Sequence, residues 1–318
     1  MLRVFEAFAG YGSQSIALRN LGIEYEVVAI SEIDKYTIKA YEAIHGPINN
    51  LGDVCKINPS DIPDHDLFTY SFPCQDLSVA GKQAGLGKGT RSGLLYECEK
   101  IIEAKKPKYL LLENVKNLVG KKFKADFDKW LEYLEGLGYT NYWQVLNAKN
   151  YGVPQNRERV FVVSVLGEHE PFEWPTPTPL DKCIADILED KTDTIEVSVD
   201  KNIKPGIRAN FEREKYDIAT SNKDIYQCNC NNGWQDNKVG VKISPTIRAG
   251  NPYTCVYSGH RIRRLTPREC FRLMGMRDDD IDKIQQAGIS NTQQYKMAGN
   301  SICIPVLEYI FKNLFKGE

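Results

Sequence analysis

Short apolar segments alternate with amphipathic segments through the first half of this 318-residue chain. In the amphipathic segments the apolar residues recur every three to four positions, which is typical of helices, and the apolar segments between them have the length of strands. This alternation predicts a doubly wound α/β domain whose mostly parallel sheet is covered by helices on both faces. The expected strands are 2–9, 26–30, 66–72, 109–113, 142–146 and 160–166, and the expected helices are 13–21, 35–44, 92–104 and 123–137.

Three prolines within residues 174–179 interrupt the pattern and predict an extended linker. Residues 181–260 are polar and lose the alternation, so irregular structure is expected there, including a loop at 228–233. An apolar amphipathic helix at 307–315 suits a return of the chain to the first domain. We therefore expect one domain at 1–174, a smaller one at 175–287, and a C-terminal segment at 288–318 that packs on the first.

Composition indicates a globular protein, because 42% of the residues are hydrophobic and 26% are charged. No stretch is long and apolar enough for a membrane helix, and no signal peptide follows Met1, so a cytoplasmic protein without a membrane partner is expected. The nine cysteines form no CxxC pair. Neither a disulfide framework nor a zinc site is therefore expected, and no metal is predicted.

A basic stretch stands out against the net charge of −1 of the whole chain. Residues 241–277 contain eight basic residues and one acidic residue, Glu269, which gives this stretch a net charge of +7. Six of the basic residues are arginines between Arg261 and Arg277, and arginine suits bidentate contacts with phosphate or with base edges. The stretch therefore predicts a polyanion partner, with a solvated helical face as the alternative.

A glycine-containing turn joins the first expected strand to the first expected helix. Gly10 and Gly12 would let a ligand approach the main chain beside a helix N-terminus. Ser15 replaces the third glycine of a dinucleotide fingerprint, so an adenosine-like ligand without a pyrophosphate is expected. Glu32 follows the next strand, where it suits ribose hydroxyls, and Asp53 suits an adenine amino group. Either carboxylate is also explained as a helix cap or a turn residue.

Reactive side chains follow two later strands. Pro73 places Cys74 directly after an expected strand, at the carboxyl edge where sites of α/β proteins form, although a lone cysteine is more often an inert core residue. Glu113 ends the strand at 109–113, where it would hold or donate a proton.

Alternating side chains enter the strand after that. Gln155, Arg157 and Arg159 are expected on one face, with Asn156 and Glu158 on the other. Two arginines on one face favour an anion.

In order along the chain, these motifs resemble those of the DNA cytosine-5 methyltransferase family of bacterial and phage restriction-modification systems. The likeness covers nearly the whole chain. It comprises the loop at 8–12, Glu32, Pro-Cys-Gln at 73–75, Glu-Asn-Val at 113–115, Gln155 with Arg157 and Arg159, residues 264–269, and Gly-Asn-Ser-Ile at 299–302.

The resemblance implies a Rossmann-like S-adenosylmethionine-dependent catalytic domain at 1–174 and a target-recognition domain at 175–287. The methyl donor would be S-adenosyl-L-methionine. Its implied contacts are Phe8, Ala9, Gly10, Tyr11, Gly12, Glu32, Ile33, Asp53, Pro73, Leu94, Asn300 and Ser301.

The resemblance also implies covalent catalysis on a cytosine that is flipped out of the duplex. Cys74 would add to carbon 6, Glu113 would act at ring nitrogen 3, and Arg157 and Arg159 would complete the catalytic set. The proton of carbon 5 would leave to a base that the sequence does not reveal, such as water.

Double-stranded DNA is the implied partner, and Gln75, Ser78, Lys82, Gln155, Arg248 and Arg264 are the expected contacts. The glycine-rich segment 75–88 suits a lid that closes on phosphate, or a surface loop without that role. Arg248 suits either a guanine or a phosphate.

Three other functions account for part of these motifs. A transfer RNA cytosine-5 methyltransferase and a catalytically inactive DNA-binding protein both remain as alternatives, whereas the missing third glycine opposes a nicotinamide oxidoreductase. The expected enzyme is a monomer that protects DNA, either beside a separately acting restriction endonuclease or as an orphan or phage enzyme.

Overall fold

The structure of the 318-residue chain is a computed structural model. It describes residues 1–73, 94–189, 226–229, 239–241, 243–247, 249, 254–258 and 261–316. The chain forms two compact units. The first comprises Met1–Asn147, Glu158–Thr176 and Val306–Glu318, and the second comprises Ala148–Arg157 and Pro177–Pro305.

A six-stranded sheet with the order β2-β1-β3-β4-β7-β5 forms the first unit. Strands β1 to β4 pair in parallel, and β7 runs antiparallel to both of its neighbours. The prediction of a mostly parallel sheet is therefore confirmed. The strands are β1 (Leu2–Ala7), β2 (Tyr25–Ser31), β3 (Leu67–Tyr70), β4 (Tyr109–Val115), β5 (Tyr139–Asn147) and β7 (Glu158–Leu166).

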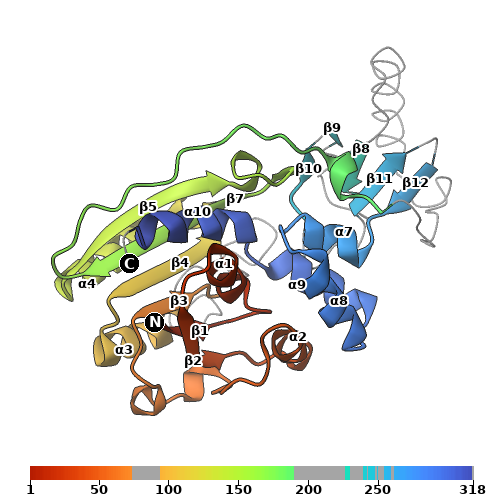
Figure 1. Ribbon diagram of the computed structural model, residues 1–318. Coiled ribbons are helices and arrows are strands. Elements are labelled where there is room, and N and C mark those ends of the chain that lie inside the picture. Colours follow the sequence, from red (N-terminus) through yellow and green to blue (C-terminus); the bar gives the residue numbers. More distant parts are fainter. Residues whose placement is uncertain are drawn as a thin grey trace. The chain divides into compact units, whose positions relative to one another are not determined.

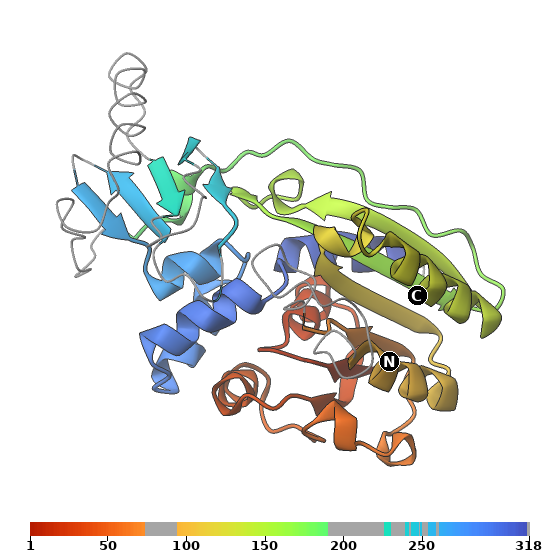
Figure 2. The same ribbon diagram turned by 180° about the vertical axis from the view of Figure 1, so that it is seen from behind.

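Helices cover both faces of this sheet, as Figures 1 and 2 show from opposite sides. Helices α3 and α4 lie on one face, and α1, α2 and α10 lie on the other. Asn20 of α1 donates a hydrogen bond to Glu308 of α10 at 2.7 Å, which joins the two ends of the chain. The helices are α1 (Ser13–Leu21), α2 (Lys35–His45), α3 (Leu95–Lys105), α4 (Lys124–Gly136) and α10 (Ile304–Leu314).

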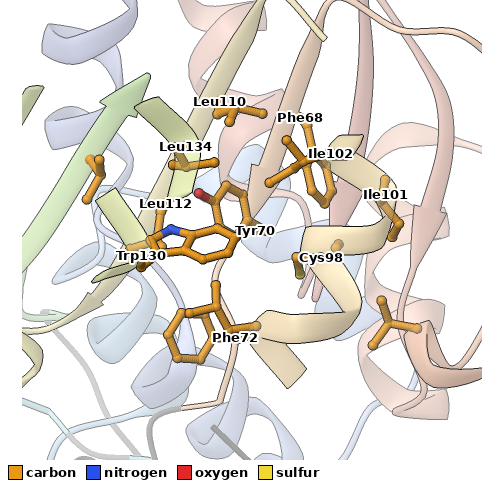
Figure 3. Packing of buried hydrophobic residues seen from close by; sticks show 14 of the residues in the cluster. Phe68, Tyr70, Phe72, Cys98, Ile101, Ile102, Leu110, Leu112, Trp130 and Leu134 are labelled. Carbon is orange, nitrogen blue, oxygen red and sulfur yellow. The ribbon is translucent and has the colours of Figure 1, made fainter. Parts of the chain in front are cut away.

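Several aromatic residues pack with aliphatic ones in the core between the sheet and helices α3 and α4, which is called the aromatic core below (Figure 3). Alternate positions of a strand face the same side, so Phe68 and Tyr70 of β3 both point into this core. Phe68 stacks on Phe5 of β1 with ring centroids 5.3 Å apart, and the Tyr70 ring meets Trp130 of α4 edge to face. This packing fixes the position of the strand that leads to Pro73.

The second unit contains a four-stranded antiparallel sheet, ordered β12-β11-β8-β9, and a parallel pair of β10 and β6. The expectation of irregular structure at 181–260 is wrong for its described strands, and the expected loop at 228–233 begins inside β8. These strands are two to five residues long, too short to show a clear alternation. The elements are β6 (Gln155–Asn156), β8 (Tyr226–Asn229), β9 (Val239–Val241), β10 (Ser244–Pro245), β11 (Thr254–Ser258), β12 (Arg261–Arg264), α7 (Pro267–Arg272), α8 (Asp278–Gln286) and α9 (Asn291–Asn300).

The proline-rich linker has neither helix nor strand from 169 to 183, as its sequence predicts. Within the first unit, Asn313 of α10 donates to the Glu173 carbonyl at 2.9 Å. The units divide at 176/177 and 305/306, whereas the sequence places its boundaries at 174/175 and 287/288. The assignment of a catalytic and a recognition domain stays a prediction. Short 3-10 turns complete the elements of the described residues: η1 (Val54–Lys56), η2 (Pro59–Asp61), η4 (Lys116–Val119), η5 (Ala148–Asn150) and η6 (Ile184–Ile187).

Candidate active site

The turn between β1 and α1 has an unusual main-chain conformation. Phe8, Gly10 and Gly12 have φ angles of 56°, 60° and 81°, in the left-handed region. Such angles are costly for a residue like phenylalanine and are concentrated at functional sites. Gly12 must be glycine for a second reason, because a Cβ there would lie 2.4 Å from His45 Nε2. The turn is therefore built for a close approach to its main chain.

Glu32, directly after β2, holds this turn in place. Its Oε2 accepts a hydrogen bond from the Gly10 N–H at 3.0 Å, and its Oε1 accepts from the N–H groups of Ile33 and Asp34 at 2.8 and 2.9 Å. A carboxylate has about four lone-pair sites, so three main-chain donors leave room for one ligand hydroxyl. Beside it, the Ile33 side chain is 73% exposed, which presents an apolar surface next to a polar anchor.

Asn50 is a site residue that the sequence reasoning missed. Its Oδ1 accepts from the N–H groups of Glu32 and Gly52, at 3.1 and 3.0 Å, and its Nδ2 donates to the Glu32 carbonyl at 3.0 Å. It thereby ties Glu32 to the segment that carries Asp53. Asp53 itself caps η1, since its Oδ1 accepts from the Cys55 N–H at 3.1 Å. The capping role that the sequence allows for Asp53 is therefore present.

The ends of β3 and β4 are fastened together at the same sheet edge. Tyr70 and Leu112 are paired in register, and the buried Asn114 side chain donates from Nδ2 to the Phe72 carbonyl at 3.1 Å. Asn114 Oδ1 also accepts from the Val115 N–H at 2.8 Å. This pair of bonds fixes the main chain two residues before Cys74, directly beside Glu113.

Glu113 and Arg159 form an ion pair at this edge. Arg159 Nε lies 3.1 Å from Glu113 Oε1, and the two side chains retain 18% and 10% of their exposure. Arg159 also donates from Nη1 to the Glu158 carbonyl at 2.8 Å. The anion that Arg159 faces is therefore Glu113, and the pair places a carboxylate and a guanidinium together at the carboxyl end of the sheet.

A sequence model of the family described as C-5 cytosine-specific DNA methylase matches residues 2–316. The chain belongs to this family. It is a DNA (cytosine-5-)-methyltransferase, which transfers a methyl group to carbon 5 of cytosine in DNA.

Relatives of this methylase match over at least 96% of their length. The chain is 40% identical to the type II methyltransferase M2.ScrFI of Lactococcus lactis subsp. cremoris, over 100% of both chains. It is 33% identical to the type II methyltransferase M.NlaX of Neisseria lactamica, over 99% of this chain and 96% of the relative. Among solved structures, the Entamoeba histolytica methyltransferase EhMeth shares the fold, with a TM-score of 0.76, 17% identity and coverage of 99% and 98%.

Gln155 and Arg157 of the methylase are buried, and Asn156 and Glu158 are exposed, which agrees with the predicted alternation for these four residues, whereas Arg159 is half-buried. Arg157 lies between β6 and β7 and donates to the carbonyls of Ile247, Gly299 and Ser301 at 3.1, 3.1 and 2.7 Å. Gln155 Nε2 donates to the Leu273 carbonyl at 2.6 Å, and its Oε1 accepts from the Ile247 N–H at 3.2 Å. The two side chains hold the main chain of the second unit, and their catalytic and DNA-binding roles stay predictions.

The basic stretch of the methylase is partly neutralised inside the second unit. Arg272 contacts Asp278 through Nε and Nη2 at 2.8 and 2.6 Å. Arg268 pairs with Asp282 and lies 3.4 Å from Glu189 Oε1. These acids lie outside 241–277, so the net charge of +7 overstates the basic surface that is available to DNA.

Several predicted site residues of the methylase lie outside the described residues: Cys74, Gln75, Ser78, Lys82 and Arg248. Pro73 is the last described residue before Cys74. Leu94 is the next described residue along the chain, and it packs against the aromatic core. In the second unit, Asn300 is exposed at the end of α9, and Ser301 Oγ donates to the Ala298 carbonyl at 3.0 Å. Arg264 is half-buried at the end of β12.

Metal clusters and membrane-spanning helices are both absent from the described part of the methylase. No described group of three or more His, Cys, Asp or Glu side chains is arranged to hold a metal ion, and the absence of a metal stays a prediction. No described helix is long and apolar enough to cross a membrane.

Proposed function

We propose that this methyltransferase takes the methyl group from S-adenosyl-L-methionine bound at the turn of residues 8–12. Two observations support the fit. A Cβ at Gly10 would meet no described atom within 4 Å, so a ligand can approach the main chain there. The exposed Ile33 beside the Glu32 carboxylate offers an apolar face for adenine next to an acceptor for a ribose hydroxyl. Asp53, Pro73 and Leu94 complete the proposed contacts of this unit, with Phe8, Ala9, Tyr11 and Gly12. Asn300 and Ser301 are assigned to the cofactor by the resemblance alone.

The catalytic residues in this proposal are Cys74, Glu113 and Arg159. Bound S-adenosylmethionine supplies an electrophilic methyl group on a sulfonium. The Cys74 thiolate adds to carbon 6 of the flipped-out cytosine, which forms an S–C6 bond and moves an electron pair toward carbon 5 and nitrogen 3. Glu113 holds a proton at nitrogen 3, and Arg159 orients Glu113 and binds the carbonyl oxygen on carbon 2 of the cytosine. After methylation, the proton of carbon 5 leaves to water and the S–C6 bond breaks, which frees Cys74.

The hydrogen bond from Asn114 to the Phe72 carbonyl carries this proposal. It joins the strand that leads to Cys74 to the strand that ends at Glu113. Since parallel strands end at the same sheet edge, a nucleophile and a proton donor follow from adjacent strands. Glu113 also needs a fixed orientation, which the Arg159 guanidinium provides.

The proposed substrate is a cytosine within a short sequence of double-stranded DNA, in the cytoplasm of a bacterial host. Gln75, Ser78, Lys82, Gln155, Arg248 and Arg264 stay predicted DNA contacts. Since both relatives described above are named type II methyltransferases, we propose that this methylation protects DNA from a separately acting restriction endonuclease. A monomer is the expected state.

Bisulfite sequencing of plasmid DNA from cells that express the protein tests this function. We expect protected cytosines in one short sequence for the wild type and none for Cys74→Ser. Cys183→Ser is the matched control, because Cys183 caps the short turn η6 and serine is a good cap, so protection should persist. No protected cytosine with any protein would overturn the DNA function, and transfer RNA would then be assayed.

A second experiment identifies the nucleophile directly. In DNA that contains 5-fluorocytosine at the protected position, no base can remove fluorine as a cation, so the S–C6 bond cannot break. We expect a complex that resists denaturing electrophoresis for the wild type and for Cys183→Ser, and none for Cys74→Ser. The same complex with Cys74→Ser would show that another residue attacks carbon 6.

A further inference from the structure

A carboxyl group lies in the core on the sheet face that packs against α1 and α2. Glu6 of β1 is fully buried, whereas its strand neighbours Phe5 and Ala7 point into the aromatic core on the opposite face. Its Oε1 accepts a hydrogen bond from Ser15 Oγ at 2.8 Å, and its Oε2 accepts from the Tyr41 hydroxyl at 3.0 Å. The described residues place no cation against Glu6. Because the burial of a carboxyl group without a cation costs free energy of folding, we expect Glu6 to have a functional role.

The partners of Glu6 are the side chains that support the turn of residues 8–12. The Tyr41 ring lies 4.5 Å from the His45 ring, and His45 Nε2 lies 3.1 Å from the Tyr11 carbonyl oxygen. A Cβ at Gly12 would meet both of these rings, at 2.8 Å from Tyr41 and 2.4 Å from His45. The turn therefore rests on Tyr41 and His45, while Ser15 belongs to the first helical turn that follows Gly12.

We propose that Glu6 is a positioning residue for the cofactor-binding turn, and that it acts through Ser15 and Tyr41. One carboxyl group joins the helix that begins at this turn to the helix on which the turn rests. The inference rests on the proposed function in one respect, namely that the turn binds S-adenosylmethionine.

The protonation state of Glu6 changes this arrangement in an accessible pH range. Burial raises the pKa of Glu6 from 4.5 to about 7, and the bonds from Ser15 and Tyr41 offset part of that rise. The ionised carboxylate accepts from both hydroxyls, whereas the protonated form must donate one hydrogen bond, so one hydroxyl has to turn away.

Few other groups can cause such a change. Tyr41 remains a neutral donor, because burial, and then the charge of Glu6, raise its pKa well above its usual value. From β2, Tyr25 contributes to the raised pKa of Tyr41, and from β3 the residue paired with Glu6 is Thr69, which does not ionise. His45 of α2 is the remaining titratable group beside Tyr41, and it must be controlled for, because histidine ionises in the same range.

The first test measures the turn without any ligand. Protein labelled with 15N-glycine is titrated by NMR from pH 5.5 to 8.5 in a His45→Gln background, with and without Glu6→Gln. We expect the Gly10 and Gly12 amide resonances to move with a midpoint near pH 7 when Glu6 is present, and to lose that titration in Glu6→Gln. Identical curves in both proteins, or no movement in either, would overturn the proposal.

Tyr41→Phe is the second variant, in case Glu6→Gln fails to fold. It keeps the ring against Gly12 but removes one donor to the ionised carboxylate, so the midpoint should move upward by up to one pH unit. Tyr139→Phe is its matched control, because that buried hydroxyl donates to the Pro107 carbonyl instead, and the midpoint should not move. An unchanged midpoint in Tyr41→Phe would contradict the proposed route through Tyr41.

The second test measures ligand binding by calorimetry with S-adenosylhomocysteine, the product, so that turnover is not needed. We expect the wild type to bind three- to tenfold more tightly at pH 8 than at pH 6, and Glu6→Gln to lose this difference. If the glycine resonances respond to Glu6 but the two proteins bind with the same pH dependence, a role in cofactor binding is excluded. If neither protein binds while the resonances still respond, the proposed cofactor site has failed and the positioning of the turn stands.

Discussion

Two buried glutamates of the same sheet are held by different chemistry. Glu6 lies within β1 and contacts two neutral hydroxyls, from Ser15 and Tyr41. Glu113 lies near the end of β4 and contacts the guanidinium of Arg159. The charge of Glu113 is compensated by a cation near the edge of the sheet, whereas no described cation compensates the charge of Glu6. If the proposals above hold, one carboxyl of this sheet acts on the substrate and the other positions the cofactor-binding turn.

Glu113→Gln should have the largest effect, and it should lower the rate of methyl transfer without changing the affinity for the cofactor. Glutamine still fits beside Arg159 but holds a proton at nitrogen 3 less well, so the rate of methyl transfer should fall by about 10² to 10⁴. Single-turnover methyl transfer and calorimetry with S-adenosylhomocysteine would measure the two properties. The matched control is Glu158→Gln, because Glu158 is an exposed glutamate that pairs with Lys116, and it should retain the wild-type rate. A parallel loss of cofactor affinity in Glu113→Gln would contradict a role confined to the chemical step.

Glu6→Gln should change how stability depends on pH. The folded-state pKa of Glu6 is raised from 4.5 to about 7, so between these values the folded protein holds a proton that the unfolded chain releases. Its stabilising effect is complete below pH 4.5 and is lost as the pH rises to 7, which lowers the free energy of unfolding by about 3 kcal/mol. Urea unfolding at pH 5 and pH 8 measures this, and Glu6→Gln should lose less stability than the wild type across the interval. Equal losses would show that Glu6 does not ionise in this range.

Arg159→Ala should destabilise the protein by about 2 kcal/mol, because it removes the guanidinium that compensates the charge of the nearly buried Glu113 carboxylate. The cost should shrink in a Glu113→Gln background, where position 113 carries no charge, and a double-mutant cycle in urea unfolding measures the difference. Additive effects would mean that the ion pair contributes nothing measurable.

Local patterns explain which parts of this structure were predictable. The expected helix 13–21 coincides with α1. Its helical periodicity lies within the segment, and Gly12 and Gly22 mark its two ends, so both signals are local. The motifs around Glu32 and Glu113 were predictable because Glu32 directly follows β2 and Glu113 lies near the end of β4. In contrast, the short polar strands of the second unit carry too few alternating positions, so β8 was expected to be loop.

Contacts between distant residues were not predictable. Tyr41 lies 35 residues from Glu6, and the carbonyls that Arg157 binds lie 90 to 144 residues away. Such partners are set by how the elements pack, which the linear pattern does not contain. For this reason the sequence predicted an anion beside Arg157, whereas the structure shows that its guanidinium donates to main-chain carbonyls. Cys74 and Arg248 lie outside the described residues, so their placement stays a prediction.

Tyr41→Phe should have the smallest effect, and it separates a hydrogen bond to an ionisable group from one to a carbonyl. Removal of this hydroxyl takes one donor from Glu6 and should cost about 1 kcal/mol. The cost should be larger at pH 8 than at pH 5, because the ionised carboxylate depends more on its donors. Tyr139→Phe removes a hydroxyl that donates to the Pro107 carbonyl at 2.8 Å, so its cost should be similar and independent of pH. Urea unfolding of both variants at pH 5 and pH 8 measures the two costs. If the cost of Tyr41→Phe and the cost of Tyr139→Phe depended on pH to the same extent, Glu6 would not differ from an ordinary buried acceptor.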